Sequence, residues 1–136
     1  MELMMWKVSY ETGHAKLDEQ HKGLLATFER MQHALVDEGD GGDAMELLAE
    51  LKARTAEHFR TEDELMERFL YPEEEDHKGI HGRLIAQIEE LYRRVEVGQT
   101  AMTPPVVKFL ESWLTDHIQG EDFRLAEFLI AKGNQA

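Results

Sequence analysis

Histidine and glutamate side chains recur in this chain at spacings that suit metal binding. His58 and Glu62 are four residues apart, and so are His77 and His81. Residues four apart lie on the same face of an α-helix, so each pair can direct two ligand atoms at one point. The two pairs therefore predict fragments of a metal site that two different helices build.

Polar residues occupy inward-facing positions of the predicted helices, where leucine is the usual residue. They are His21, His58, Glu62, His77 and His81. Burying a polar group without a partner costs a few kcal/mol, and burying an unpaired charge costs far more. A lone inward-facing histidine is usually a satisfied core residue, but polar residues on several helices that share one interior need a common partner. A metal centre supplies that partner.

The fourth predicted helix offers two carboxylates after its histidine. His117 is followed by Glu121 four residues later and by Asp122 five residues later. An ideal helix places Glu121 on the same face as His117, so the helical period favours Glu121. The residues alone leave Asp122 as the alternative.

The ligand types narrow the choice of metal. The chain has no cysteine, which excludes thiolate zinc sites, iron-sulfur clusters and cysteine nucleophiles. Imidazole and carboxylate ligands suit iron, with zinc, copper, nickel and manganese also compatible. Five histidines and two carboxylates exceed the needs of one ion and suit a pair of ions bridged by carboxylates.

Four long stretches with helical periodicity position these residues, and no strand pattern of comparable length occurs. The predicted helices cover about 18–37, 43–70, 73–97 and 104–131. Long helices joined by short connections favour antiparallel neighbours. The sequence therefore predicts an all-α, up-down-up-down antiparallel four-helix bundle with an N-terminal arm over residues 1–16, and a single domain over residues 1–136.

Composition excludes several classes of function. Fifteen basic against 28 acidic residues give a net charge of −13, so we expect no nucleic acid and no anionic membrane as partner. No apolar stretch approaches the roughly 18 residues that span a bilayer, and the N-terminus does not look like a signal peptide. We therefore expect a cytoplasmic protein. Motifs of zinc proteases, phosphate-binding loops and serine hydrolases are missing.

Four segments of the sequence resemble the hemerythrin family, and in particular its single-domain bacterial form. They are GHAKLDEQHKGL at 13–24, HFRTEDELM at 58–66, YPEEEDHKGIH at 71–81 and WLTDHIQGED at 113–122. The likeness runs from Trp6 to about Leu129. A ferritin-like site, with two Glu-x-x-His motifs, fits less well, because within the predicted helices only Glu74 and His77 have that spacing.

The resemblance implies a centre of two iron ions with a bridging oxo or hydroxo group. One iron would have three histidine ligands, His77, His81 and His117, and the other would have two, His21 and His58. Two carboxylates, Glu62 and Asp122, would bridge the two irons. The family pattern thus selects Asp122 over Glu121, against the helical period. The iron with two histidines keeps a position open for dioxygen.

The resemblance also implies an apolar oxygen pocket beside the irons. Its residues would be Leu24, Phe59, Trp113, Leu114 and Ile118. Such a pocket must exclude water and protons for oxygen binding to stay reversible. All five residues lie on or beside helix seams, so ordinary core packing accounts for them equally well, and the two roles are compatible.

Two further histidines are not assigned to iron. His33 falls on the predicted solvent-facing side of the first helix. His14 precedes that helix, where we expect it to form a turn or to contact a ligand histidine.

Reversible dioxygen binding for transport, storage or delivery in a bacterial cell is the function that the resemblance implies, without enzymatic activity. One alternative is a diiron enzyme that reduces peroxide or nitric oxide at the same site. Another is an oxygen or iron sensor that acts through a partner protein. We expect a monomer whose ligand is dioxygen, with an unknown protein partner only for delivery or signalling.

Overall fold

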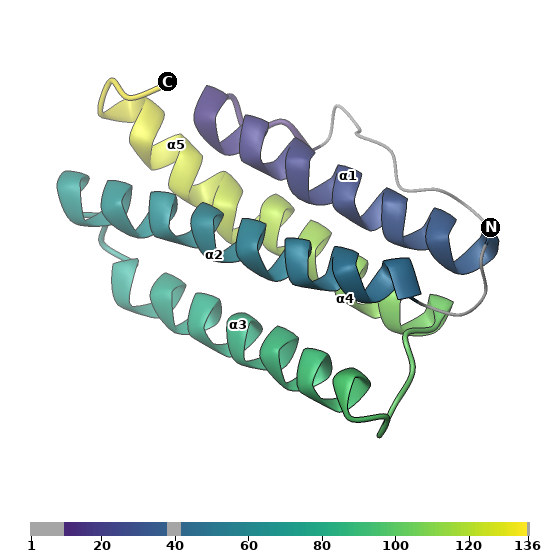
Figure 1. The fold of residues 1–136 in the computed structure, drawn as a ribbon. Coiled ribbons are helices and arrows are strands. Elements are labelled where there is room, and N and C mark those ends of the chain that lie inside the picture. Colours follow the sequence, from purple (N-terminus) through teal and green to yellow (C-terminus); the bar gives the residue numbers. More distant parts are fainter. Residues whose placement is uncertain (1–9, 38–41, 136) are drawn as a thin grey trace.

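The computed structural model of the chain is an antiparallel bundle of helices (Figure 1). It describes residues 10–37 and 42–135. Three rods of the bundle are single helices, α1 (Ala15–Asp37), α2 (Gly42–Phe69) and α3 (Glu74–Glu96). The fourth rod consists of α4 (Pro104–His117), the π-helical turn η2 (Ile118–Asp122) and α5 (Phe123–Ala131).

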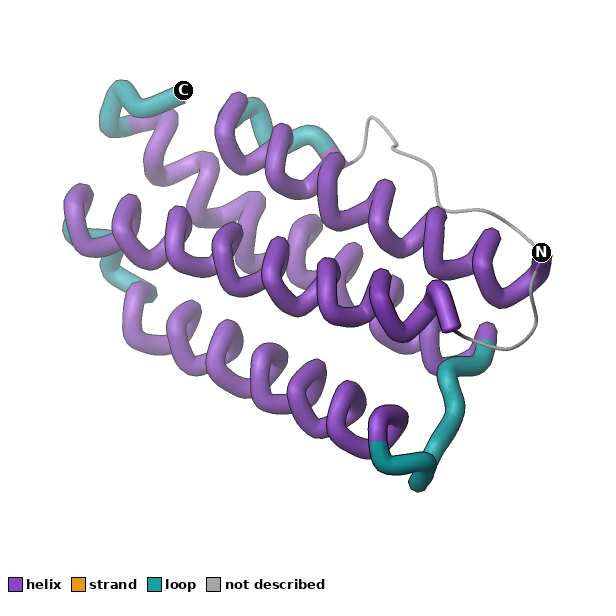
Figure 2. The backbone as a smooth tube through the Cα atoms, in the orientation of Figure 1, coloured by secondary structure: helices purple, strands orange, loops and turns teal. Residues whose placement is uncertain are grey.

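Successive rods run in opposite directions and are joined by short segments, and the described ranges contain no strand (Figure 2). The predicted all-α, up-down-up-down four-helix bundle is confirmed. The expected N-terminal arm over residues 1–16 needs a correction, because residues 15 and 16 already belong to α1. Residues 1–9 of that arm, with Trp6, lie outside the described residues.

The helix α1 begins at Ala15, ahead of the predicted start at residue 18, because His14 caps it. The Nδ1 atom of His14 accepts a hydrogen bond from the backbone N–H of Leu17 at 3.3 Å. Its Nε2–H then donates to Oδ1 of Asn134 at 2.6 Å. The turn-forming role expected of His14 is confirmed, and His33 is exposed as predicted.

The start of α1 is tied to the C-terminal segment. The backbone N–H of Ala15 donates to the carbonyl oxygen of Gln135 at 2.8 Å, and Figure 1 shows the C-terminus beside the first turn of α1. Asp18 stabilises the preceding turn by accepting hydrogen bonds from the N–H groups of Thr12 and Gly13 at 2.9 and 3.2 Å. The first and last rods are thereby held side by side.

Two apolar clusters fill the interior of the bundle. The small cluster lies near the α2–α3 loop and comprises Leu17, Met66, Tyr71, Leu125, Ala126 and Leu129. The large cluster extends towards the opposite end and comprises Tyr10, Leu24, Leu25, Phe28, Met31, Leu48, Leu51, Phe59, Leu84, Ile88, Met102, Val107, Leu110, Leu114 and Ile118. A layer of buried polar residues lies between the two clusters along α1, α2 and the fourth rod, with Phe59 and Ile118 of the large cluster interspersed among the polar residues.

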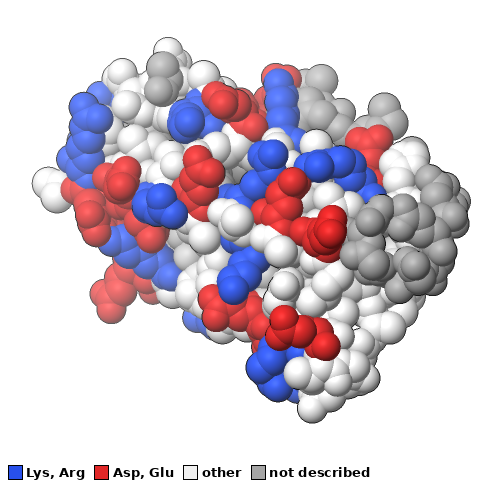
Figure 3. Space-filling model, viewed as in Figure 1, with Lys and Arg blue, Asp and Glu red and all other residues white. Residues whose placement is uncertain are grey.

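Charged side chains cover much of the face of the molecule in Figure 3. Basic and acidic side chains intermix over the face in Figure 3, without a patch of basic residues. None of the helices in the described ranges has the length and apolar character that crossing a membrane requires.

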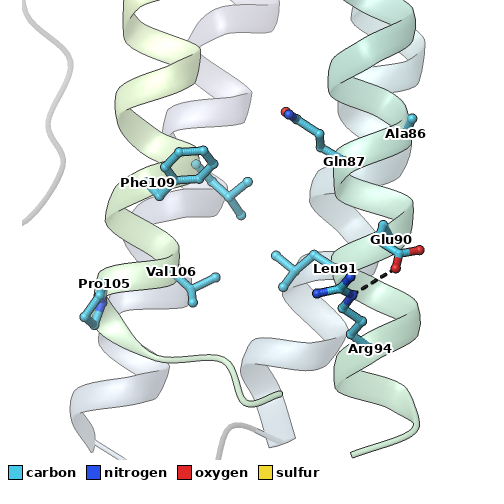
Figure 4. Close-up of a pocket in the computed structure, with 9 residues that line it drawn as sticks. Ala86, Gln87, Glu90, Leu91, Arg94, Pro105, Val106 and Phe109 are labelled. Atoms are coloured by element: carbon cyan, nitrogen blue, oxygen red, sulfur yellow. Dashed lines mark hydrogen bonds and ion pairs between the residues drawn. The ribbon is translucent and has the colours of Figure 1, made fainter. Parts of the chain in front are cut away.

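An apolar groove of about 620 Å³ lies between α3 and α4, away from the polar layer (Figure 4). Leu91 of α3 faces Val106 and Phe109 of α4 across it, and an ion pair between Glu90 and Arg94 lies on its α3 side. None of the residues that line it belongs to the polar layer.

Candidate metal centre

The buried polar layer consists of five histidines and two carboxylates, all of which the sequence singled out. They are His21, His58, Glu62, His77, His81, His117 and Asp122, and each is at most 4% exposed. Their potential ligand atoms form two overlapping groups, in each of which these atoms lie within 4.8 Å of one another. One group has three histidines, the other has two, and both contain Glu62 and Asp122.

Glu62 divides its two carboxylate oxygens between the groups. Its Oε2 lies 3.0 Å from Nε2 of His58, in the group with two histidines. Its Oε1 lies 2.9 Å from Nε2 of His77 and 2.8 Å from Nε2 of His81, in the group with three. A carboxylate placed in this way can bridge two metal ions.

Asp122 divides its oxygens in the same way from the opposite rod. Its Oδ2 lies 2.7 Å from Nε2 of His21 and 3.5 Å from Nε2 of His58. Its Oδ1 lies 3.3 Å from Nε2 of His77 and 3.1 Å from Nε2 of His117. Two carboxylates that each face both histidine groups define two adjacent ion positions with two shared ligands.

The π-helical turn η2 brings Asp122 to this place. A π-helical turn has i→i+5 hydrogen bonds and is wider than an α-helical turn, so Asp122, five residues after His117, comes onto the same face as His117. Glu121, which an uninterrupted α-helix would favour, keeps its side chain 27% exposed, with Oε2 at 3.8 Å from Nδ1 of His117. The structure therefore places Asp122, and not Glu121, among the clustered ligand atoms.

Buried polar atoms at the centre of the layer are left without hydrogen-bond partners, as a metal site requires. Among the described residues they include Oε2 of Glu62, Nε2 of His81, Nε2 of His117 and Oδ1 of Asp122. Buried polar atoms are ordinarily paired, and four such atoms that converge call for a cation. Nitrogen and oxygen donors without sulfur suit iron, so the residues present fit a pair of iron ions.

The charges of the layer also favour a cation. Burial disfavours protonated His58, but the carboxylates of Glu62 and Asp122 outweigh burial and raise its pKa to about 10. Burial also disfavours protonated His77, but Asp122 and Glu62 again outweigh burial and raise the pKa of His77 to about 9. Although burial acts the other way, the neighbouring histidines hold the pKa values of Glu62 and Asp122 below their ordinary range. The centre of the layer thus stabilises positive charge.

Comparison with known proteins agrees with this geometry. A family model described as the hemerythrin HHE cation binding domain matches residues 12–129.

The chain belongs to the hemerythrin family.

Its relatives span nearly the whole chain. The myohemerythrin of Theromyzon tessulatum is 28% identical over 119 residues, which are 88% of this chain and 88% of the relative. The bacteriohemerythrin of Stenotrophomonas maltophilia is 28% identical over 135 residues, which are 99% of this chain and 87% of that protein. A crystal structure of wild-type hemerythrin superimposes with a TM-score of 0.87 at 22% identity, covering 94% of this chain and 98% of that one. That likeness bears on the fold, which is the same four-helix bundle.

Hemerythrins are oxygen-binding proteins with a diiron centre, and the family is not typically enzymatic. The polar layer of this hemerythrin can hold such a centre. The prediction of two iron ions as cofactor, made from the residue types and the resemblance, is therefore confirmed at the level of the family.

In this hemerythrin the five residues expected to form an oxygen pocket all lie against the polar layer or in the large apolar cluster. The ring of Phe59 stacks on His81 with centroids 3.7 Å apart, and Trp113 stacks on His117 at 5.1 Å. Leu24, Leu114 and Ile118 are buried members of the large apolar cluster, while Trp113 is partly buried. Apolar side chains thus lie against the polar layer where it meets the large apolar cluster.

One space in this hemerythrin lies within the large apolar cluster and another reaches the layer. The first is a small hollow of about 10 Å³, near the least that one water needs, and it is lined by Leu114 and by Phe28, Leu51, Thr55, Leu84, Ile88 and Leu110. Of the expected pocket residues, only Leu114 lines it. A larger and more polar cleft of about 410 Å³ reaches His117 and includes Trp113, Asp116 and Glu121.

Hydrogen-bond partners for the outer ring nitrogens of the histidines are residues that the sequence did not single out. The Nδ1–H of His58 donates to Oε1 of Gln20 at 2.7 Å. The Nδ1–H of His81 donates to Oδ1 of Asp63 at 3.1 Å. Gln20 precedes His21 and Asp63 follows Glu62, so both residues are neighbours of predicted ligands in the sequence. That proximity was the only available signal, and it does not reveal which histidine each residue contacts.

Proposed function

We propose that this hemerythrin binds dioxygen reversibly at a diiron centre and transports, stores or delivers it. The observation that supports the proposal is the unequal division of histidines around two shared carboxylates. The group with three histidines offers five ligand residues and the group with two offers four. Ion positions of unequal ligand number leave room for an external ligand on the side with fewer.

Each residue of the layer has a proposed role. His77, His81 and His117 would hold one iron. His21 and His58 would hold the other, and Glu62 and Asp122 would bridge the two. When bound, the two ferrous ions supply the electrons that dioxygen takes up on binding and returns on release.

The surrounding apolar residues keep the reaction reversible by excluding water. Phe59 covers one face of His81, and Leu114 and Ile118 fill the interior on the α4 side. An apolar surrounding keeps protons and water from the bound oxygen, which would otherwise be lost in a reduced form. Residues that elsewhere serve packing alone therefore also set the lifetime of the oxygenated protein.

An optical experiment tests the proposal. The iron-loaded protein is reduced without air, exposed to oxygen and then deoxygenated, with visible spectra recorded at each stage. A band that appears with oxygen and disappears on its removal supports reversible binding. Irreversible oxidation with turnover of peroxide or nitric oxide would replace the proposal by a diiron enzyme. A protein without any iron-dependent band would contradict the assigned ligands.

A further inference from the structure

The outer nitrogens of the histidines meet different kinds of partner on the two sides of the layer. In the group with three histidines, Nδ1 of His81 faces the carboxylate of Asp63 at 3.1 Å. In the same group, Nδ1 of His117 lies 3.8 Å from a carboxylate oxygen of Glu121 and has no hydrogen-bond partner within the described residues. The carboxylates of this side lie at the edge of the layer, with side chains 36% and 27% exposed.

The group with two histidines has a neutral partner instead. Nδ1–H of His58 donates to the amide oxygen of Gln20 at 2.7 Å. The hydroxyl of Thr61 donates to the carbonyl oxygen of Glu57 at 3.2 Å and accepts from Nε2 of Gln20 at 2.9 Å, which fixes the orientation of the amide. Nδ1 of His21 has no hydrogen-bond partner within the described residues.

The charge of such a partner affects how strongly a histidine binds a metal ion. A carboxylate that accepts the outer N–H increases the basicity of the imidazole, and removing it typically weakens metal binding by 10- to 100-fold. Hydrogen bonds to an ionised acceptor are about twice as strong as those between neutral groups. Gln20 therefore orients His58, but it increases the strength with which His58 binds a metal ion less than Asp63 does for His81.

We infer that Asp63 makes the position with three histidines the tight one that fills first, and that neutral Gln20 leaves the position with two histidines weaker. The inference rests on the ligand assignment of the proposed function. Asp63 and Gln20 are positioning residues, because they act on the ions through the histidines. The position with three histidines thus has more ligand residues and also a charged partner for one of its histidines, and both features favour tighter metal binding there.

Calorimetric titration of the metal-free full chain with Co²⁺ tests the inference. We expect two binding steps in the wild type. Asp63→Asn should weaken the tight step by about 10- to 100-fold and leave the weak step unchanged. Glu64→Gln is the matched control, since it removes the same charge from an exposed neighbour on α2. Asp63→Glu, which keeps a carboxylate, should recover most of the lost affinity.

The opposite change, which adds a carboxylate beside a histidine of the weaker position, provides a second test of the inference. Gln20→Glu should strengthen the weak step by about tenfold, whereas Ala26→Glu, at an exposed position of α1, should leave it unchanged. His117→Ala should abolish the tight step and His21→Ala the weak one. These two variants, with the visible bands of Co²⁺ as a second readout, identify which position each step fills.

The outcomes separate the inference from the function on which it rests. Two ions bound with one common affinity, or an Asp63→Asn variant in which both steps weaken equally, would overturn the inference and leave the proposed function intact. Fewer than two ions per chain in the wild type would overturn the ligand assignment itself.

Discussion

At the scale of single residues, Glu121 and Asp122 are adjacent acidic side chains with different surroundings. Asp122 is fully buried with each oxygen facing a different histidine group, whereas Glu121 lies in a cleft at the edge of the layer. The difference comes from the backbone, because η2 turns the fifth residue after His117 inward. Side-chain chemistry alone would not have distinguished them.

We expect Asp122→Asn to lose at least one of two iron ions, because an amide cannot supply two anionic oxygens to a bridged pair. Glu121→Gln, the matched control, should keep both ions. Iron content per chain after reconstitution, together with the visible spectrum, measures the difference. Full iron content and an unchanged spectrum in Asp122→Asn would show that this residue does not bridge.

Leu114 tests the role of the apolar side chains that lie against the polar layer. Leu114→Tyr adds bulk and a hydroxyl group at a buried position that also lines the small hollow, and overpacking of this kind costs about 1–3 kcal/mol. We expect the variant to keep its iron while its oxygen affinity or autoxidation rate changes, as oxygen equilibrium and decay of the visible band would show. Phe109→Tyr, at an exposed position of α4, is the control. An unaltered oxygen response would remove Leu114 from the pocket.

The sequence predicted part of this site, for reasons visible in single residues. His58 with Glu62 and His77 with His81 follow the helical period, so their spacing sufficed. Asp122 follows a different period over five residues and was selected only by resemblance to a family. The partners Gln20 and Asp63 depend on how side chains of neighbouring turns and rods meet, which no spacing within one helix reveals.

At the scale of elements, two glycines in and after α3 allow the effect of a side chain on helix stability to be compared with its effect on a left-handed backbone. Gly82 has helical backbone and open space where a Cβ would lie, and Gly98 has the same space but a φ of +80°. We expect Gly82→Ala to raise the free energy of unfolding by about 0.5–1 kcal/mol and Gly98→Ala to lower it by about 1–2 kcal/mol. Urea unfolding of both variants measures the shifts, and changes of the same sign would refute this account.

The bounds of the elements show what the sequence contained about the fold. Gly98, Gly133 and the prolines gave most helix ends to within a few residues of their observed positions. The start of α1 was placed too late because its cap is the imidazole of His14, held by Asn134 from the far end of the chain. The turn η2 was not predicted, since the helical period of the sequence does not show where an α-helix widens into a π-helical turn.

At the scale of the whole molecule, the contact between His14 and Asn134 connects the first and last rods. Asn134→Ala leaves the buried Nε2–H of His14 without its acceptor, which should lower the free energy of unfolding by about 1–3 kcal/mol. Iron content should not change, because neither residue belongs to the polar layer. Gln135→Ala is the control, since only the backbone oxygen of Gln135 accepts from Ala15. Equal stability of the two variants would contradict a structural role for this contact.

The polar layer lies between the two apolar clusters, and this arrangement has a consequence for how the molecule opens. Without ions, the layer holds unpaired buried groups, so the small and large clusters are coupled mainly through continuous helix backbone. We expect amide hydrogen exchange of the metal-free protein to show two opening units of different free energy. Metal loading should merge them into one, whereas a single unit in both forms would contradict this. The ions would then determine cooperativity as well as oxygen chemistry, and a cell short of iron would hold a protein that begins to unfold from one end.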